Sequence, residues 1–88
     1  MNAATVGTTV NWKDGNRRYS ATFGKIVEVN GVQYQEFACR FRQASKSGTA
    51  TAGFINLAES SLVDLDLRNG RIYGTFEPTL LNKAHGLL

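Results

Sequence analysis

Three turn dipeptides, each Asn or Asp followed by Gly, constrain the fold of this chain more than any other feature: Asp14-Gly15, Asn30-Gly31 and Asn69-Gly70. Each lies between runs rich in Val, Ile, Thr, Tyr and Phe, which are typical of strands. A two-residue hairpin loop needs positive φ at its central residues, and Asn-Gly or Asp-Gly adopts that backbone at the least cost. The pattern therefore predicts three two-residue β-hairpins.

The hairpin around Asn69-Gly70 gives the cleanest alternation of apolar and polar positions. A two-residue loop there places Leu67 opposite Ile72 and Val63 opposite Phe76, with acidic side chains on the other face. This is the pattern of an antiparallel hairpin with one buried face.

The hairpin around Asn30-Gly31 places Val27 opposite Tyr34 and Lys25 opposite Glu36, and the opposite charges of the second pair favour this register. Farther from the turn, both faces carry apolar residues, and the apolar character changes sides near Gly24. A glycine at such a change predicts a β-bulge or a sharp bend.

These elements predict the fold class. A softer break at Ser45–Gly48 precedes a further strand at Thr49–Leu57, and Thr79–His85 fits one short helical stretch ended by Gly86. We expect one all-β domain over residues 1–88: a small antiparallel barrel or curved meander of about six strands, built from three two-residue hairpins, with a short helical tail. A core this small makes self-association a natural supplement, so we expect a homo-oligomer.

Charge is divided unevenly along the chain. The 88 residues carry a net charge of +3, with ten Lys and Arg against seven Asp and Glu. Residues 1–50 hold seven of the bases and three of the acids, whereas residues 51–88 hold three bases and four acids. A polyanion is therefore expected to bind to the first half.

The sequence lacks the residue patterns that catalysis needs. The one histidine, His85, lies near the C-terminus, and the one cysteine, Cys39, alternates with Phe37 and Phe41 as a small buried residue does. Asp64 and Asp66 fit the polar face of a hairpin, and no phosphate-binding glycine loop or metal-ligand spacing occurs. We expect no catalytic site, no cofactor and no metal.

One constellation carries a functional prediction. With the registers above, one face of the first strands carries aromatic rings interleaved with guanidinium groups, as single-stranded nucleic acid requires for stacking and phosphate contacts. Arg18 and Lys46 lie near the same end of the strands. The predicted site consists of Trp12, Arg17, Arg18, Tyr19, Phe23, Arg40, Arg42 and Lys46.

Which sheet face is the core stays open at this point. If Phe37, Cys39 and Phe41 point inward, the aromatic–arginine face is exposed to a ligand. If Tyr19 and Phe23 point inward instead, these rings form the core and the arginines lie at its rim.

The functional hypothesis is a non-catalytic β-domain that binds nucleic acid, preferably single-stranded, with low sequence specificity. The alternative is a protein-binding, inhibitory or structural assembly module of the phage or plasmid accessory type. It would act through an edge strand at Thr49–Ile55 and through the C-terminal leucines. The single cysteine and the lack of long apolar runs favour a cytoplasmic protein with no membrane partner.

Overall fold

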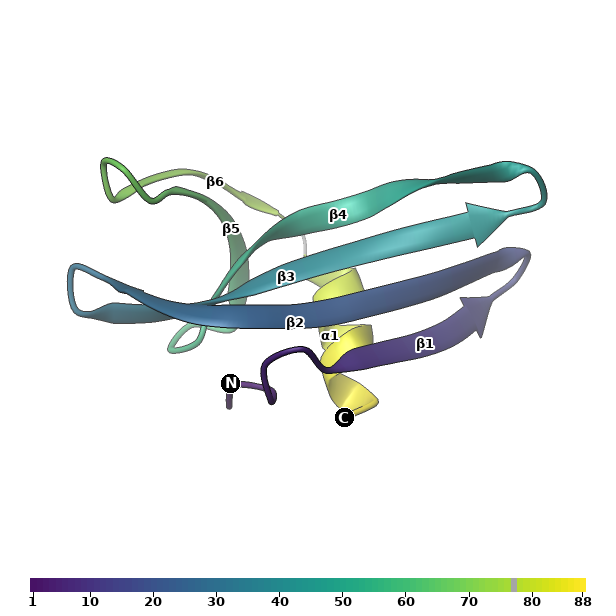
Figure 1. The fold of residues 1–88 in the computed structure, drawn as a ribbon, viewed down its shortest axis with the longest axis horizontal. Helices are drawn as coiled ribbons and strands as arrows, with labels where there is room; N and C mark the ends of the chain where they lie inside the picture. The colour runs from purple at the N-terminus through teal and green to yellow at the C-terminus, as the bar shows by residue number, and fades with distance from the viewer. Residues whose placement is uncertain (77) are drawn as a thin grey trace.

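The computed structural model of the chain describes residues 1–76 and 78–88. It contains six antiparallel strands in one sheet, followed by one short helix, as the sequence predicts (Figure 1). Each strand pairs with the next along the chain. The elements are β1 (Thr9–Asp14), β2 (Arg17–Val29), β3 (Val32–Gln43), β4 (Lys46–Asn56), β5 (Ser61–Asp66), β6 (Arg71–Phe76) and α1 (Thr79–Gly86).

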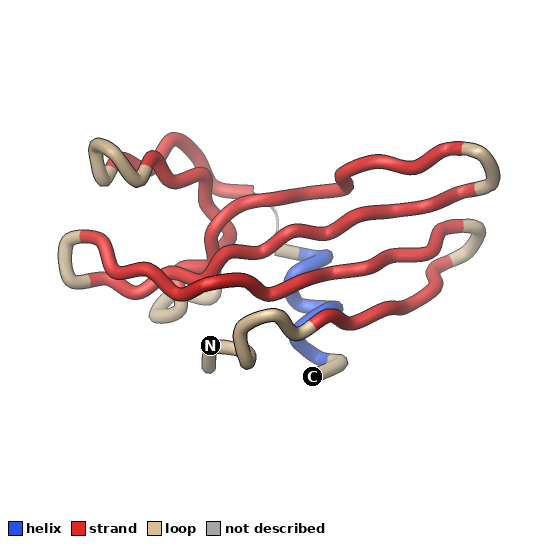
Figure 2. Tube along the Cα trace, in the orientation of Figure 1, coloured by secondary structure: helices blue, strands red, loops and turns tan. Residues whose placement is uncertain are grey.

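The sheet is an open, curved meander. The strand order is β1-β2-β3-β4-β5-β6, and across the described residues the sheet does not close, so the barrel alternative is not met. β4 pairs with β5 only over Phe54–Asn56, where the chain turns away from the long strands. Figure 2 shows the tips of the β1–β2 and β3–β4 hairpins at one end of the sheet, with the β2–β3 turn at the other. We call the end with the two tips the arm end.

Three two-residue loops join the first four strands, but only one of them is at the predicted residues. Asn30-Gly31 joins β2 to β3 with φ of 51° and 79°, as predicted. The first loop is Gly15-Asn16 rather than Asp14-Gly15, because Asp14 pairs with Arg17. Gly15 has φ of 58°, which matches the glycine required at the first central position of a type II′ turn.

The third two-residue loop is Ala44-Ser45, which the sequence analysis placed one residue too late, at Ser45–Gly48. β4 therefore begins at Lys46, three residues earlier than expected. Ala44 has φ of 51°, a left-handed backbone that an alanine adopts only with strain.

Relief of this strain gives a first prediction. Ala44→Gly should raise the free energy of unfolding by about 0.5–1 kcal/mol, because the strain it removes exceeds the entropy that glycine adds to the unfolded chain. Gly15→Ala, at the equivalent position of the first hairpin, should lower it by a similar amount, and no neighbouring atom lies within 4 Å of the added Cβ. Urea unfolding of both variants measures the difference. A destabilised Ala44→Gly variant would contradict the assigned strain.

The predicted register of the β5–β6 hairpin is wrong. Asp66 pairs with Arg71, so the loop has four residues rather than two, and Ile72 lies opposite Leu65 instead of Leu67. The β5–β6 pairing shifts by one more residue between Asp64 and Leu65, so the rest of β6 also departs from the predicted register.

The cause is the Asp66 side chain, which closes the longer loop. Its Oδ1 accepts the backbone N–H of Arg68 at 2.9 Å, and its Oδ2 accepts the Asn69 side-chain amide at 2.8 Å. The N–H of Gly70 donates to the Asp66 carbonyl at 2.8 Å. Such Asx hydrogen bonds stabilise a turn that the Asn-Gly dipeptide alone does not indicate.

The predicted bulge near Gly24 is confirmed. The β2–β3 register shifts between Phe23 and Ile26, where two residues of β2 face Glu36 alone. A Cβ on Gly24 would lie 2.9 Å from Glu36 Cβ, so the close approach requires glycine. The extra residue brings Phe23 opposite Phe37 rather than Ala38. From the bulge toward the arm end, every paired β2 residue faces a β3 partner one position away from the predicted one.

The bent sheet has a core on each side. On one side, α1 packs its buried Leu81 and Ala84 against the sheet, and in Figure 1 the helix lies behind β2. On the other side, β5 covers the half of the sheet beyond the bulge. The first core contains Ala4, Ala21, Phe23, Phe37, Cys39, Ile55, Leu62, Leu81 and Ala84; the second contains Tyr34, Val63 and Leu65.

A buried glutamine fastens the N-terminal segment to the bulge. Gln35 is fully buried, and its Oε1 accepts the N–H of Ala4 at 3.0 Å. Its Nε2 donates to the carbonyls of Ala4 and Gly24 at 2.9 and 3.0 Å. One side chain thus satisfies two buried backbone groups of Ala4 and the partly buried carbonyl of Gly24.

Candidate nucleic-acid interface

The bulge places the aromatic residues of the arm end on one side of the sheet. Tyr19 is opposite Trp12 on β1 and opposite Phe41 on β3. Direct partners in an antiparallel pair project from the same face, so these three rings share a face. The rings of Trp12 and Tyr19 stack with centroids 5.1 Å apart and an interplanar angle of 17°. We call these three residues the aromatic side; all are partly buried.

Phe23 serves the core rather than a surface. It is fully buried, and its ring contacts that of Phe37 edge-on at 5.3 Å. The sequence left two alternatives, in which either the Phe37–Phe41 set or the Tyr19–Phe23 set points inward. Neither describes the structure, because the one-residue shift at the bulge puts both sets on the same face. We therefore leave Phe23 out of the candidate site.

Arg17 lies with the aromatic residues. Its guanidinium carbon is 4.5 Å from the centroid of the Phe41 ring, and its Nε donates to Gln43 Oε1 at 3.1 Å. A loop at Asp14-Gly15, as the sequence predicts, would pair Trp12 with Arg17; this is wrong, because the displaced loop pairs Arg17 with Asp14.

The other predicted arginines lie on the opposite face. Arg18 is opposite Lys13 on β1 and opposite Arg42 on β3, so three cationic side chains form one row across three neighbouring strands. Arg40 is in the next row of the same face, opposite Ser20. The sequence pairing of Tyr19 with Arg42 is wrong, because the extra β2 residue at the bulge places Tyr19 opposite Phe41 instead. We call Lys13, Arg18, Arg40 and Arg42 the cationic face; all four are exposed.

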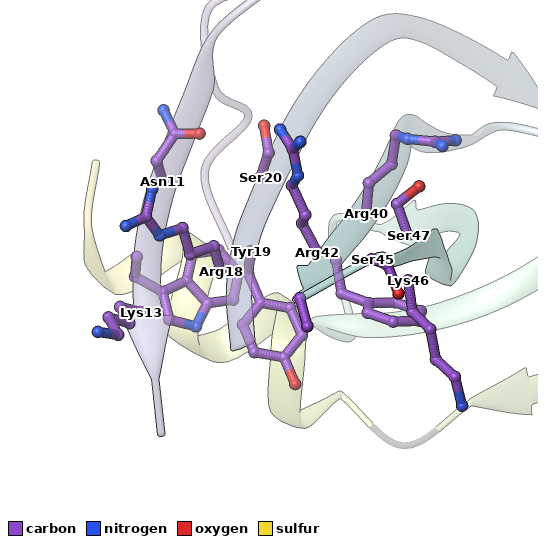
Figure 3. Close-up of a pocket in the computed structure, with 13 residues that line it drawn as sticks. Asn11, Lys13, Arg18, Tyr19, Ser20, Arg40, Arg42, Ser45, Lys46 and Ser47 are labelled. Carbon is purple, nitrogen blue, oxygen red and sulfur yellow. The ribbon is translucent and has the colours of Figure 1, made fainter. Parts of the chain in front are cut away.

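An open depression of about 940 Å³ lies at the arm end around these residues. Figure 3 shows Asn11, Ser20, Arg40 and Arg42 reaching to one side of the strands, with Tyr19 and Lys46 extending to the other. Among the described residues, no acidic side chain lines the depression. Its lining is Asn11, Trp12, Lys13, Arg18, Tyr19, Ser20, Arg40, Phe41, Arg42, Ala44, Ser45, Lys46 and Ser47.

The charges of the cationic face are not neutralised by the protein. Within residues 1–76 and 78–88, none of its four side chains forms an ion pair or a hydrogen bond. Like charges directly opposite one another destabilise a sheet, and strands lie only about 4.8 Å apart. An anion between these side chains removes that repulsion.

Sequence reasoning missed Lys13, Asn11 and Ser20 as parts of the site. The signal is present in the alternation of β1, where the polar Asn11 and Lys13 alternate with the apolar Val10 and Trp12. With the first loop assigned correctly, that alternation places Lys13 beside Arg18.

No family matches this chain. Comparisons with protein-family models, curated proteins and solved structures all end without a match. The site must therefore be interpreted from its own geometry.

Three titratable residues outside this site, Cys39, His85 and Asp66, have structural surroundings. Burial raises the pKa of the Cys39 thiol by desolvation, which keeps the thiol protonated. His85 Nε2 lies 3.2 Å from the carbonyl oxygen of Asn2 and so joins the two ends of the chain. Asp66 closes the β5–β6 loop. Among the described residues, no cluster of His, Cys, Asp or Glu has metal-site geometry, and no helix is both long and apolar enough to cross a bilayer.

Proposed function

We propose that the cationic face binds the phosphate backbone of nucleic acid with little sequence specificity. The observation that carries the proposal is the depression at the arm end, whose lining in the described part of the chain includes five cationic side chains and no acidic one. Three of the five form a single cross-strand row without protein counter-charges. Arginine presents a planar fork of donors that suits phosphate oxygens.

The lining also favours phosphate over a protein surface. Besides the cations, Asn11, Ser20, Ser45 and Ser47 supply neutral donors around the same depression. Side chains of these types, together with Arg and Lys, make most of the phosphate and sugar contacts in protein–nucleic acid complexes. Such contacts position the nucleic acid but do not distinguish its sequence, hence the low specificity of the proposal.

Base stacking is a separate part of the hypothesis. Trp12 and Tyr19 stack on each other on the side of the sheet away from the cationic face. A strand that contacts both sides has to bend around the arm end, which a flexible single strand does far more readily than a duplex. A preference for single strands therefore depends on the aromatic side, while affinity depends on the cationic face.

A fluorescence-anisotropy titration of labelled single-stranded DNA, single-stranded RNA and duplex DNA at two salt concentrations tests the proposal. We expect saturable binding to all three that weakens steeply with salt, because bound cations release counterions. Tighter binding of single strands supports stacking. Absence of binding at low salt would exclude the nucleic-acid function.

The second candidate function is assembly through an edge strand. The predicted edge, Thr49–Ile55, lies in β4, which pairs with β3 along its length and with β5 only from Phe54. In the described residues, the segment before Phe54 has no strand on its other side. The C-terminal leucines differ in burial. Leu81 is buried against the sheet, whereas Leu87 and Leu88 are about half exposed, at 45% and 52%.

A further inference from the structure

Two of the asparagines in the chain precede a glycine, and both lie at turns. Asn30-Gly31 is the two-residue loop between β2 and β3, and Asn69-Gly70 is the second half of the four-residue loop between β5 and β6. The two loops are neighbours, because a Cβ placed on Gly70 would lie 3.2 Å from Asn30 Nδ2. Both asparagines are exposed. The same chemistry is therefore open to both residues, and their hydrogen bonds decide which of them reacts.

The chemistry is attack by the backbone nitrogen of the glycine on the side chain of the preceding asparagine. Glycine has no side chain to shield that nitrogen. The nitrogen bonds to the asparagine Cγ, the Cγ–Nδ2 bond breaks, and ammonia leaves with the proton of the N–H. Water then opens the cyclic imide: hydrolysis at Cγ gives aspartate, and hydrolysis at the backbone carbonyl gives isoaspartate. The reaction requires a side-chain amide that is free to rotate and an N–H that is not held elsewhere.

At Asn69, both reacting groups are held by Asp66. The Asn69 amide donates to Asp66 Oδ2 at 2.8 Å, and the N–H of Gly70 donates to the Asp66 carbonyl oxygen at 2.8 Å. The carboxylate also opposes loss of the proton from the Gly70 nitrogen, because a like charge nearby disfavours a second negative charge. The hydrogen bonds that close the β5–β6 loop therefore protect its asparagine.

At Asn30, neither reacting group is held. In the part of the chain that the structure describes, the Asn30 amide and the Gly31 N–H form no hydrogen bond. The turn also lies beyond the neighbouring strands, since β1 pairs with β2 only as far as Thr22 and β4 pairs with β3 only from Tyr34. It is the end of a two-stranded ribbon, and such an end opens locally without unfolding the rest of the sheet.

We propose that Asn30 is a site of spontaneous modification, which converts to aspartate and isoaspartate in the folded protein, whereas Asn69 is protected. The site is separate from the proposed nucleic-acid interface, because the β2–β3 turn lies at the end of the sheet opposite the arm end (Figure 2). In the isoaspartate product the backbone runs through the side-chain carbon and is therefore longer. The two-residue loop of positive φ at Asn30 and Gly31 has no room for that extension, so this product should unfold at a lower urea concentration.

Incubation of the folded protein at mildly alkaline pH, followed by peptide mapping with mass spectrometry, tests the proposal. We expect Asn30 to convert about tenfold faster than Asn69 or more, since two hydrogen bonds have to break before Asn69 reacts. The same chain unfolded in urea is the matched control, and there the two sites should convert at similar rates. Conversion of Asn69 as fast as Asn30 in the folded protein would overturn the proposal. So would an Asn30 that reacts in urea but stays intact in the folded chain.

Asp66→Ala tests the cause of the protection. The substitution removes the carboxylate that holds the Asn69 amide, so conversion at Asn69 should rise toward the rate at Asn30. The rate at Asn30 should stay as in the parent, which reports that the rest of the sheet is intact. Asp64→Ala removes an exposed acid from the same strand and should leave both rates unchanged. An Asn69 that stays as slow in the Asp66 variant as in the parent would contradict the assigned protection.

Discussion

Replacing Arg40 and Arg42 by alanine should weaken nucleic-acid binding by about tenfold or more at moderate salt, since each phosphate contact releases counterions. The slope of log affinity against log salt should fall in magnitude by roughly 1.4 to 1.8, from two lost contacts at about 0.7 to 0.9 each. Both side chains are exposed and unpaired, so the fold should be unaffected. Anisotropy titrations at several salt concentrations measure both quantities.

A charge-matched control separates a site from a general effect of net charge. Lys25→Ala with Arg68→Ala removes the same two positive charges, from exposed residues away from the arm end. We expect this variant to keep the salt slope of the parent. Equal losses in the two double variants would show that the chain attracts polyanions through its overall charge, and the proposed location would be wrong.

Gln35→Leu should lower the free energy of unfolding by about 3–5 kcal/mol, because it leaves two buried backbone groups and one partly buried group without partners, at roughly 1–3 kcal/mol each, partly offset by relaxation. The N-terminal segment at Ala4 should loosen first, since two of the three hydrogen bonds of the Gln35 side chain are to that residue. Urea unfolding followed by Trp12 fluorescence gives the stability, and amide exchange at Ala4 reports the local loosening.

The neighbouring Gln33→Leu is the control for this prediction. Gln33 is exposed on the same strand, and its replacement should change stability by no more than about 0.5 kcal/mol. If the two variants were equally stable, the hydrogen bonds of Gln35 would not be holding the N-terminal segment in place.

Part of the fold was predictable because local chemistry dictated it. Asn30-Gly31 has positive φ at both residues, which few other dipeptides accept, so the β2–β3 hairpin is fixed by those two residues. Gly24 marks the bulge because a side chain there would collide with Glu36. The helix at Thr79–Gly86 and the count of six strands follow from the same kind of local pattern.

The composition of the candidate site was not predictable, because the face of a strand residue depends on register. A β-strand alternates with a period of two, so an error of one residue transfers a side chain to the other face. Both Asp14-Gly15 and Gly15-Asn16 are acceptable loops; they differ in turn type, which the dipeptides alone do not decide. Displacing this loop by one residue changes the β1–β2 partners by two positions and leaves the faces unchanged. The uncounted bulge residue is the one-residue error, and it merged Arg40 and Arg42 with Tyr19.

The β5–β6 hairpin failed for a different reason. The apolar alternation in the sequence was regular, but the Asp66 side chain stabilises a longer loop through hydrogen bonds to Arg68 and Asn69. A side chain that binds the backbone of its own loop competes with the strand ladder. The exposure of Ile72 and Phe76 follows from this displaced register and the edge position of β6.

The most direct test of the central claim is a chemical-shift map of isotope-labelled protein titrated with a short single-stranded oligonucleotide. We expect the largest changes to fall on the strand segments around Lys13, Arg18, Arg40 and Arg42, and added salt to reverse them. Changes confined to β6, or to the half of the sheet beyond the bulge, would contradict this expectation. So would a spectrum that does not change.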